Sequence, residues 1–420
     1  MSNSKDVMSF CISRENIKTK ITNFEYILVF IFIILCGFTS ADVIPAKTYI
    51  LSILCGYYIF TKKNKQSLKP LFVLVIGYIL IGILQYFKFG YFSYSTIRDI
   101  PLLIFSGFYI VDKLGYKFRY AYFNIMVILS VISVVFFVLM VVANYIPDIS
   151  AFSQGKPYKS IFVYCIRSSE ILRLRNCGPF WEPGAFAGYV ILVGVLYFKD
   201  LKVLWNTQRK KCLILLLALL TTQSSQGYIM FIILLLGYIY KDRLTMRVIA
   251  ISMIMVIAAF VIYNETPFLR EKVEEQLSLS KDWESNESLI SANRFTTSLL
   301  DFYYIEKSPF IGNTDNQKIR YRDHDAILYV VENKGGYGTG SGTTWQMATY
   351  GIPLYLLWLF LSCNSLRKFY SKKETLMVIT IIILLGSAEL YNTYIFYMSL
   401  PFIIYGRCRS NMNKKESLSV

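Results

Sequence analysis

The sequence predicts an all-α integral membrane protein, and three observations lead to this fold class. Hydrophobic residues make up 55% of the chain. They are gathered in repeated runs of about 15 to 22 residues, which is the length that crosses a bilayer as a helix. Basic residues recur after every second run, as they do where short loops rich in Lys and Arg stay in the cytoplasm. This pattern predicts a single polytopic domain over residues 1–420, with about twelve transmembrane helices.

Each apolar run gives one expected helix, although the shorter runs make the count approximate. In the first half of the chain the runs are residues 24–39, 47–60, 70–87, 100–111, 122–145 and 183–198. In the second half they are residues 212–222, 227–240, 244–263, 344–363, 375–390 and 393–405. Lys and Arg before the first run and after each even-numbered run predict that both termini are cytoplasmic. Much of the net charge of +17 is therefore topological and gives no support to nucleic-acid binding.

Two long polar segments on the predicted outer side are the places to look for chemistry. Residues 146–182 form a basic loop, and residues 264–342 form a larger loop between the ninth and tenth spans. The first loop carries an excess of positive charge on the side where positive charge is normally avoided. Its charged residues up to Gly178 are Lys156, Lys159, Arg167, Arg173 and Arg175, against Asp148 and Glu170. The excess indicates anion binding, and the alternative is an ordinary solvated surface, which long loops tolerate.

The end of the first loop places two ionisable residues beside an apolar run. Arg175 comes just before a turn at Gly178 and Pro179, and Glu182 precedes Pro183, where a helix is expected to begin. Ionisable groups at this depth are costly and indicate a functional site. For Glu182 a second reading stays open, because an acidic residue at a helix start also interacts favourably with the helix dipole.

At this point the chain resembles a known family. The run Arg-x-x-Gly-Pro-Phe-x-Glu-Pro-Gly-Ala-Phe-Ala, at residues 175–187, is similar to the signature of Wzy-type polysaccharide polymerases, relatives of the O-antigen ligases. Three further features agree with that family in order and spacing. They are the segment Thr221–Gly227, the segment Asn293-Arg294-Phe295 followed by Lys307–Gly312, and Ser341-Gly342 followed by Tyr350–Pro353.

The resemblance implies a bundle like that of the multi-spanning glycosyltransferase C class, in a bacterial cytoplasmic membrane. Similar proteins polymerise undecaprenyl-diphosphate-linked oligosaccharides at the outer face into O-antigen, capsular or exopolysaccharide. Donor and acceptor are both lipid-linked glycans, and a chain-length regulator and a flippase are the implied protein partners. No cofactor or metal is implied. Arginines in the two outer loops recur in the family, and by position they are Arg175 and Arg294 here.

The chemistry of glycosyl transfer from a diphosphate asks for such residues independently. Negative charge develops on the leaving diphosphate, and Arg side chains can stabilise it. Arg173 and Arg98 are further candidates for contact with the diphosphate, although Arg98 can instead pair with its neighbour Asp99. The attacking sugar hydroxyl also needs a base. Glu182 is the first candidate for this role and His324 the second.

His324 is the only histidine, and it lies between Asp323 and Asp325. An Asp-x-Asp pattern can hold a divalent cation. A solvated ion-pair cluster with Arg320 and Arg322 is the favoured alternative. The second loop is also expected to contain an amphipathic helix near residues 269–277, a helix over residues 293–305 with Arg294 and Asp301 on one side, and a flexible Gly-rich connector at residues 335–342. In the first loop, Cys165 and Cys177 are candidates for a disulfide.

Two alternatives to the polymerase remain open. One is an O-antigen ligase-type enzyme that passes glycan to another acceptor; the lack of a histidine near residues 340–345 counts mildly against it. The other is a polysaccharide exporter or flippase, which should carry charges along the interior of the bundle. Here the expected spans are poor in charge and the polar residues are concentrated in two outer loops, which favours catalysis at one membrane face.

Overall fold

The computed structural model describes residues 21–38, 47–61, 68–143, 145, 149–153, 156–167, 175–239, 274, 285, 294–334, 337, 341–367 and 370–387. Several predictions lie outside these residues and stay predictions. They are the spans at residues 244–263 and 393–405, the amphipathic helix at residues 269–277, the place of Arg173, most of the Gly-rich connector, and the side of the membrane on which the two ends lie.

The first half of the chain folds into helices that match the expected runs closely. They are α2 (Asn23–Gly37), α3 (Lys47–Thr61), α4 (Lys69–Phe89), α5 (Ile100–Leu114) and α6 (Tyr116–Ala143), with a short π-helix η3 (Ser95–Asp99) before α5. Local signals begin these helices. Thr22 and Glu25 cap α2 reciprocally, while Pro residues stand in the first turns of α4 and α5, where no amide hydrogen bond is lost.

The second half continues with short and medium helices. They are α8 (Pro183–Leu196), η4 (Phe198–Asp200), α9 (Leu201–Thr207), α10 (Arg209–Thr221), α11 (Ser225–Ile239), α15 (Arg294–Lys307), α16 (Gln317–Arg320), α17 (Asp325–Lys334), α18 (Gly342–Tyr350), α19 (Ile352–Arg367) and α20 (Lys372–Ser387). The helix expected over residues 293–305 is thereby confirmed as α15. Every residue of α8 is buried, which places this helix at the centre of the bundle.

The structure confirms a mainly helical protein with helices suited to a membrane. In the described part of the chain, Lys69–Phe89 and Lys117–Ala143 are long and apolar enough to cross a bilayer. A third span results if α8 and the segment Phe198–Thr207, bent by 70° at their junction, count as one. Four further apolar helices are shorter. The expected number of about twelve therefore stays a prediction.

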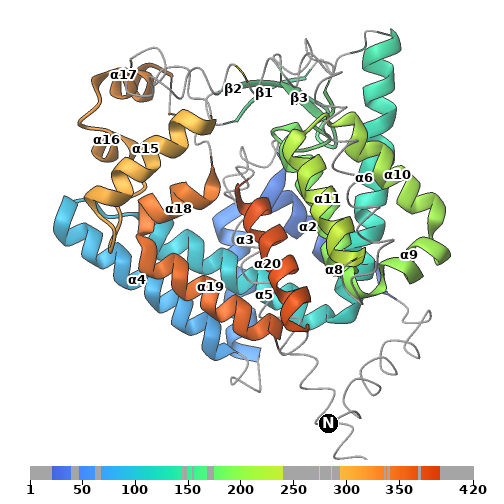
Figure 1. Ribbon diagram of the computed structural model, residues 1–420, viewed down its shortest axis with the longest axis horizontal. Coiled ribbons are helices and arrows are strands. Elements are labelled where there is room, and N and C mark those ends of the chain that lie inside the picture. Colours follow the sequence, from blue (N-terminus) through green and yellow to red (C-terminus); the bar gives the residue numbers. More distant parts are fainter. Residues whose placement is uncertain are drawn as a thin grey trace, which may run out of the picture.

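A small antiparallel sheet in the first outer loop was not predicted. Its strands are β1 (Ile149–Ser153), β2 (Lys156–Ser160) and β3 (Cys165–Arg167), in the order β1-β2-β3. The register pairs Tyr158 of β2 with Arg167 of β3. Figure 1 shows this sheet and the helices α15–α17 at the same end of the molecule, opposite α9. The two long polar loops thus contribute their described helices and strands to one end of the bundle.

The single span expected at residues 344–363 is wrong, because the chain breaks into α18 and α19 at Gly351. Gly351 has φ 87° and ψ 156°, a conformation that only glycine adopts readily. The amide of Ile352, just after the break, donates to Pro309 O at 2.8 Å. The segment that follows α15 therefore fits against the junction of α18 and α19.

Gly351→Ala should prevent stable folding. A Cβ at this position would overlap with the carbonyl group of Phe310, and the backbone strain alone costs of order 1–3 kcal/mol. Gly56→Ala in α3 is the matched control, because its Cβ would meet nothing within 4 Å. The check is the yield of monodisperse protein after detergent extraction, and a normal yield for Gly351→Ala would contradict this account of the break.

Candidate functional site

Arg175 is buried between the first long polar loop and the C-terminal end of α10. Its Nε donates to Thr222 O at 3.3 Å and its Nη2 donates to Gln223 O at 3.2 Å. Both carbonyls lie just after the last residue of α10. The partial negative charge of the helix dipole favours a cation at this end. The side chain is 7% exposed. Two segments singled out in the sequence, residues 175–187 and 221–227, are thus brought together by a fixed guanidinium group.

Asn176 completes this junction and is fully buried. Its amide N–H donates to Thr221 O at 3.0 Å, and its Nδ2 donates to the hydroxyls of Thr221 and Ser133 at 2.9 Å and 3.3 Å. Its Oδ1 accepts the amide of Gly178 at 2.9 Å. The polar atoms of Asn176 therefore hold the turn that carries Arg175 against α10 and α6.

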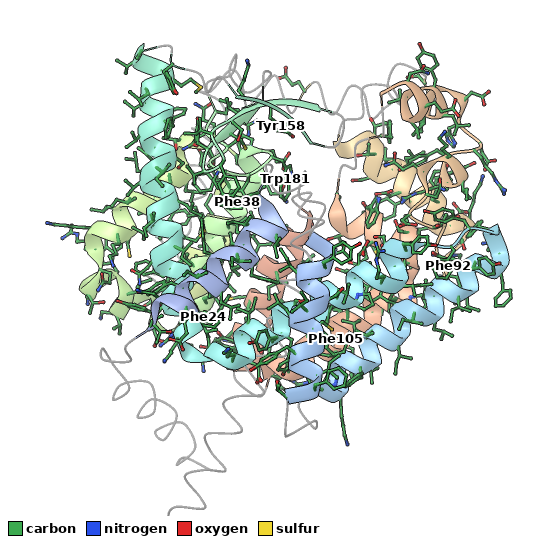
Figure 2. All side chains as sticks on the ribbon, turned by 180° about the vertical axis from the view of Figure 1, so that it is seen from behind. Phe24, Phe38, Phe92, Phe105, Tyr158 and Trp181 are labelled. Atoms are coloured by element: carbon green, nitrogen blue, oxygen red, sulfur yellow. The ribbon has the colours of Figure 1, made fainter. Side chains whose placement is uncertain are left out.

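The disulfide between Cys165 and Cys177 is wrong, because both residues are thiols. The Sγ of Cys165 donates to Phe180 O at 2.8 Å, and its amide donates to Gly178 O at 2.7 Å. Backbone hydrogen bonds thus attach strand β3 to the turn, which is the connection that the disulfide was expected to provide. Figure 2 shows Trp181, within the same turn, between the sheet and α2.

Glu182 lies at the start of α8, as expected. It occupies the N-cap position with extended backbone, and its carbonyl accepts the amide of Phe186 at 3.2 Å. Its side chain does not cap the helix and is half-buried. At this position the carboxylate still interacts favourably with the helix dipole, so both readings of Glu182 stay open and its role as a base stays a prediction.

His324 lies in an aromatic cluster rather than in a cluster of carboxylates. Its Nδ1 is 3.0 Å from the hydroxyl of Tyr304, and its ring packs edge-on against Tyr303. The neighbouring Asp323 is exposed and forms an ion pair of 2.6 Å with Lys307, which holds the pKa of this carboxyl below its usual range. The expected ion-pair cluster is confirmed for Asp323, with Arg322 at 3.7 Å.

The other two candidate arginines have different surroundings. Arg294 is the first residue of α15, and its side chain lies outside the described part of the structure. Arg98 pairs with Asp99 at 2.7 Å, as expected from their adjacency, and its side chain is 53% exposed. It also lies over the ring of Tyr94 at 5.6 Å. Arg98 is therefore accessible from the solvent at the start of α5, whereas Arg175 is held inside.

The burial of Arg320 differs most from what the sequence predicts. Arg320 was expected in a solvated cluster, yet it is 3% exposed and forms a buried ion pair with Asp301 of α15. Its Nη1 donates to the Thr349 hydroxyl at 2.8 Å, and Asp301 also accepts from the Thr344 hydroxyl at 2.7 Å. Burial raises the pKa of Asp301 to about 6, although Arg320 and Thr344 oppose the shift. Asp301 is thus the partner of Arg320.

Helix α20 joins the two groups of sequence motifs. Gln226 of the segment 221–227 donates to Leu384 O at 2.9 Å. Thr343, at the start of α18, contacts the adjacent carbonyl of Ile383 at 3.4 Å and the hydroxyl of Ser387 at 3.2 Å. The last turn of α20 therefore lies between the segment 221–227, which binds Arg175, and helix α18, which contacts Asp301. These sequence motifs thus form one continuous structure.

No family model matches the chain, and no curated protein matches it.

Proposed function

We propose that the protein is a membrane glycosyltransferase that polymerises undecaprenyl-diphosphate-linked oligosaccharide units at the outer face of a bacterial cytoplasmic membrane. In this proposal both termini are cytoplasmic and the bundle has about twelve spans. Arg175 and Arg294 stabilise the diphosphate, with Arg98 and Arg173 as further contacts. Glu182 is the proposed base for the attacking hydroxyl, and His324 is the second candidate.

The observation that carries the proposal is the meeting of separate polar motifs at one end of a membrane bundle. The sheet of the first loop and helices α15–α17 of the second lie at that end. Arg175 is fixed by two carbonyls 47 and 48 residues away, and a preorganised cation loses little free energy by reorganising during the reaction. Polar groups gathered at one end suit a reaction with a lipid-linked substrate better than passage through the bundle.

The geometry also suggests why Glu182 is a better base than His324. Glu182 begins α8 in the same turn as Arg175, seven positions along the chain, and this turn is held by Asn176. A base and a clamp for the leaving group must face the same substrate, so short connections between them favour a common site. His324 belongs instead to the aromatic cluster on α15.

Deletion of the gene should leave single repeat units on the lipid carrier, and the wild-type gene should restore long glycan chains. Arg175→Gln should not restore them, because Gln keeps N–H donors for the two carbonyls but removes the positive charge that the diphosphate needs. The measurement is the length distribution of the glycans on a gel, with the level of each variant in membranes determined in parallel.

Asn176→Ala is the comparison variant in the same turn, since it removes hydrogen bonds that hold the turn and keeps the positive charge of Arg175. We expect chain length in this variant to follow the amount of protein in the membrane. Long polymer that persists in the deletion strain but stays unattached outside the cell would favour the ligase interpretation over the polymerase. Long polymer that is retained inside the cell would favour the exporter.

A further inference from the structure

The end of α4 is attached to the second outer loop at two points and to α18 at a third. Gln85 is fully buried, and its Nε2 donates to Ile311 O and to Thr349 O, both at 2.6 Å. The Nζ of Lys88 donates to the hydroxyl of Ser308 at 2.8 Å. The segment that follows α15 is therefore held at the level at which α4, one of the two long apolar helices, ends.

Phe310 lies between these attachment points in the sequence, and 73% of it is exposed. The hydrogen bonds of Ser308 and Ile311 to α4 hold the backbone on either side of Phe310. On α15 itself, Phe302 is 53% exposed, on the side opposite to the buried Tyr304. Large exposed aromatic side chains on one folded segment indicate a surface that contacts something other than water.

The end of α4 carries an aromatic group of the same kind. Phe87 is 78% exposed, and three more exposed aromatic side chains follow or flank it. They are Tyr86, Phe92 and Tyr94, whose rings pack edge-on in the chain Tyr86–Phe92–Tyr94. Figure 2 shows Phe92 at the end of α4 that lies beside helices α15–α17. Aromatic rings at the end of a membrane-spanning helix lie at the level of the lipid headgroups.

From this continuity we propose that the second outer loop rests on the membrane, with Phe310 and Phe302 inserted among the lipid headgroups beside the aromatic end of α4. The two groups of rings form one surface, because the hydrogen bonds from Gln85 and Lys88 fix them at one level. The occupant of this surface is the lipid interface of the outer leaflet.

A lipid surface explains the exposed rings better than a protein partner does. The exposed apolar face of α4 runs along the whole helix, through Ile76, Leu80 and Ile83 to Phe87, and in a bilayer this face is covered by lipid. In the proposed placement, Phe310 extends this lipid-covered surface beyond the end of the helix. By contrast, the exposed Tyr329 belongs to α17, which packs on α16 at the far side of the loop structure.

The inference does not depend on the proposed reaction, and photo-crosslinking tests it directly. The photoreactive residue p-benzoylphenylalanine would replace Phe310, Phe302, Phe87 or Tyr329, one at a time. Each full-length protein would be placed in nanodiscs of phosphatidylethanolamine and phosphatidylglycerol, irradiated and analysed by mass spectrometry. We expect lipid adducts at positions 310 and 302, in yields within a few-fold of position 87, and at least ten-fold less adduct at position 329.

Position 87 serves as the positive control for lipid contact and position 329 as the control for an exposed aromatic residue away from lipid. Adduct at position 87 without adduct at position 310 would overturn the proposal, and so would crosslinks from position 310 mainly to a second copy of the chain. A normal elution profile on size exclusion shows that each variant has folded before it is irradiated.

Discussion

Arg320→Ala should destabilise the protein by roughly 3–5 kcal/mol, which is the cost of leaving a buried charge without its partner. Arg320 and Asp301 are almost completely buried, and the ion pair links α16 to α15. The pair also holds α18, because the Thr344 hydroxyl donates to Asp301 and the Thr349 hydroxyl accepts from Arg320. A large drop in melting temperature in detergent is the expected measurement.

Lys307→Ala is the matched control, since it breaks an ion pair of the same loop that is about 40% exposed on both sides. An exposed pair contributes roughly 0–1 kcal/mol, so this variant should melt close to wild type. Equal losses in the two variants would contradict the view that Arg320 acts as a buried partner.

The loss in Arg320→Ala should also depend on pH. Burial already raises the pKa of Asp301 to about 6 with Arg320 present, and removal of the cation raises it further. A carboxyl whose pKa is higher in the folded state stabilises the fold below its unfolded pKa, about 3.9, and this stabilisation is lost as pH rises through the folded value. The variant should therefore melt higher at pH 5 than at pH 8, and the additional change Asp301→Asn should remove that difference.

Arg294→Ala should lower the polymerisation rate by about 10²–10³-fold, which is the usual effect of removing one preorganised donor from a developing anion. Arg294 begins α15, where the helix dipole disfavours a cation, so its position favours an anionic ligand. Asp301, its neighbour two turns along, is already paired with Arg320. The measurement is the initial rate of glycan elongation by purified protein.

Arg322→Ala is the control for the removal of one positive charge from the same loop. Its side chain is 70% exposed and lies 3.7 Å from Asp323, so we expect an unchanged rate. A general electrostatic attraction of the substrate would instead lower both rates to a similar degree, and it would weaken with added salt.

The helices could be predicted from the sequence because long apolar runs leave few other structures inside a bilayer. The break at Gly351 was missed although Pro353 follows it closely, and the contacts with Pro309 and Phe310 that fix it come from a distant part of the sequence. The sheet was missed as well. Its strands are three to five residues long and lack an alternating apolar pattern.

The candidate site was only partly predictable. Arg175 was recognised from its position before an apolar helix, yet its carbonyl partners on α10 are distant in the sequence. Arg320 was predicted to be exposed because it stands in a run of charged residues with Arg322 and Asp323, and these two are indeed exposed. A signal for the buried pair was present, since Asp301 lies between Leu300 and Tyr304 on the apolar side of α15, where a lone carboxylate requires a partner.

The most direct test of the central proposal is the reaction of the purified protein in nanodiscs with a single undecaprenyl-diphosphate-linked repeat unit. The account predicts a ladder of lengthened, lipid-linked glycans with the wild type and with Arg322→Ala, and no ladder with Arg294→Ala. A folded wild-type protein that leaves the repeat unit unextended, or transfers it only to a different acceptor, would contradict the proposal.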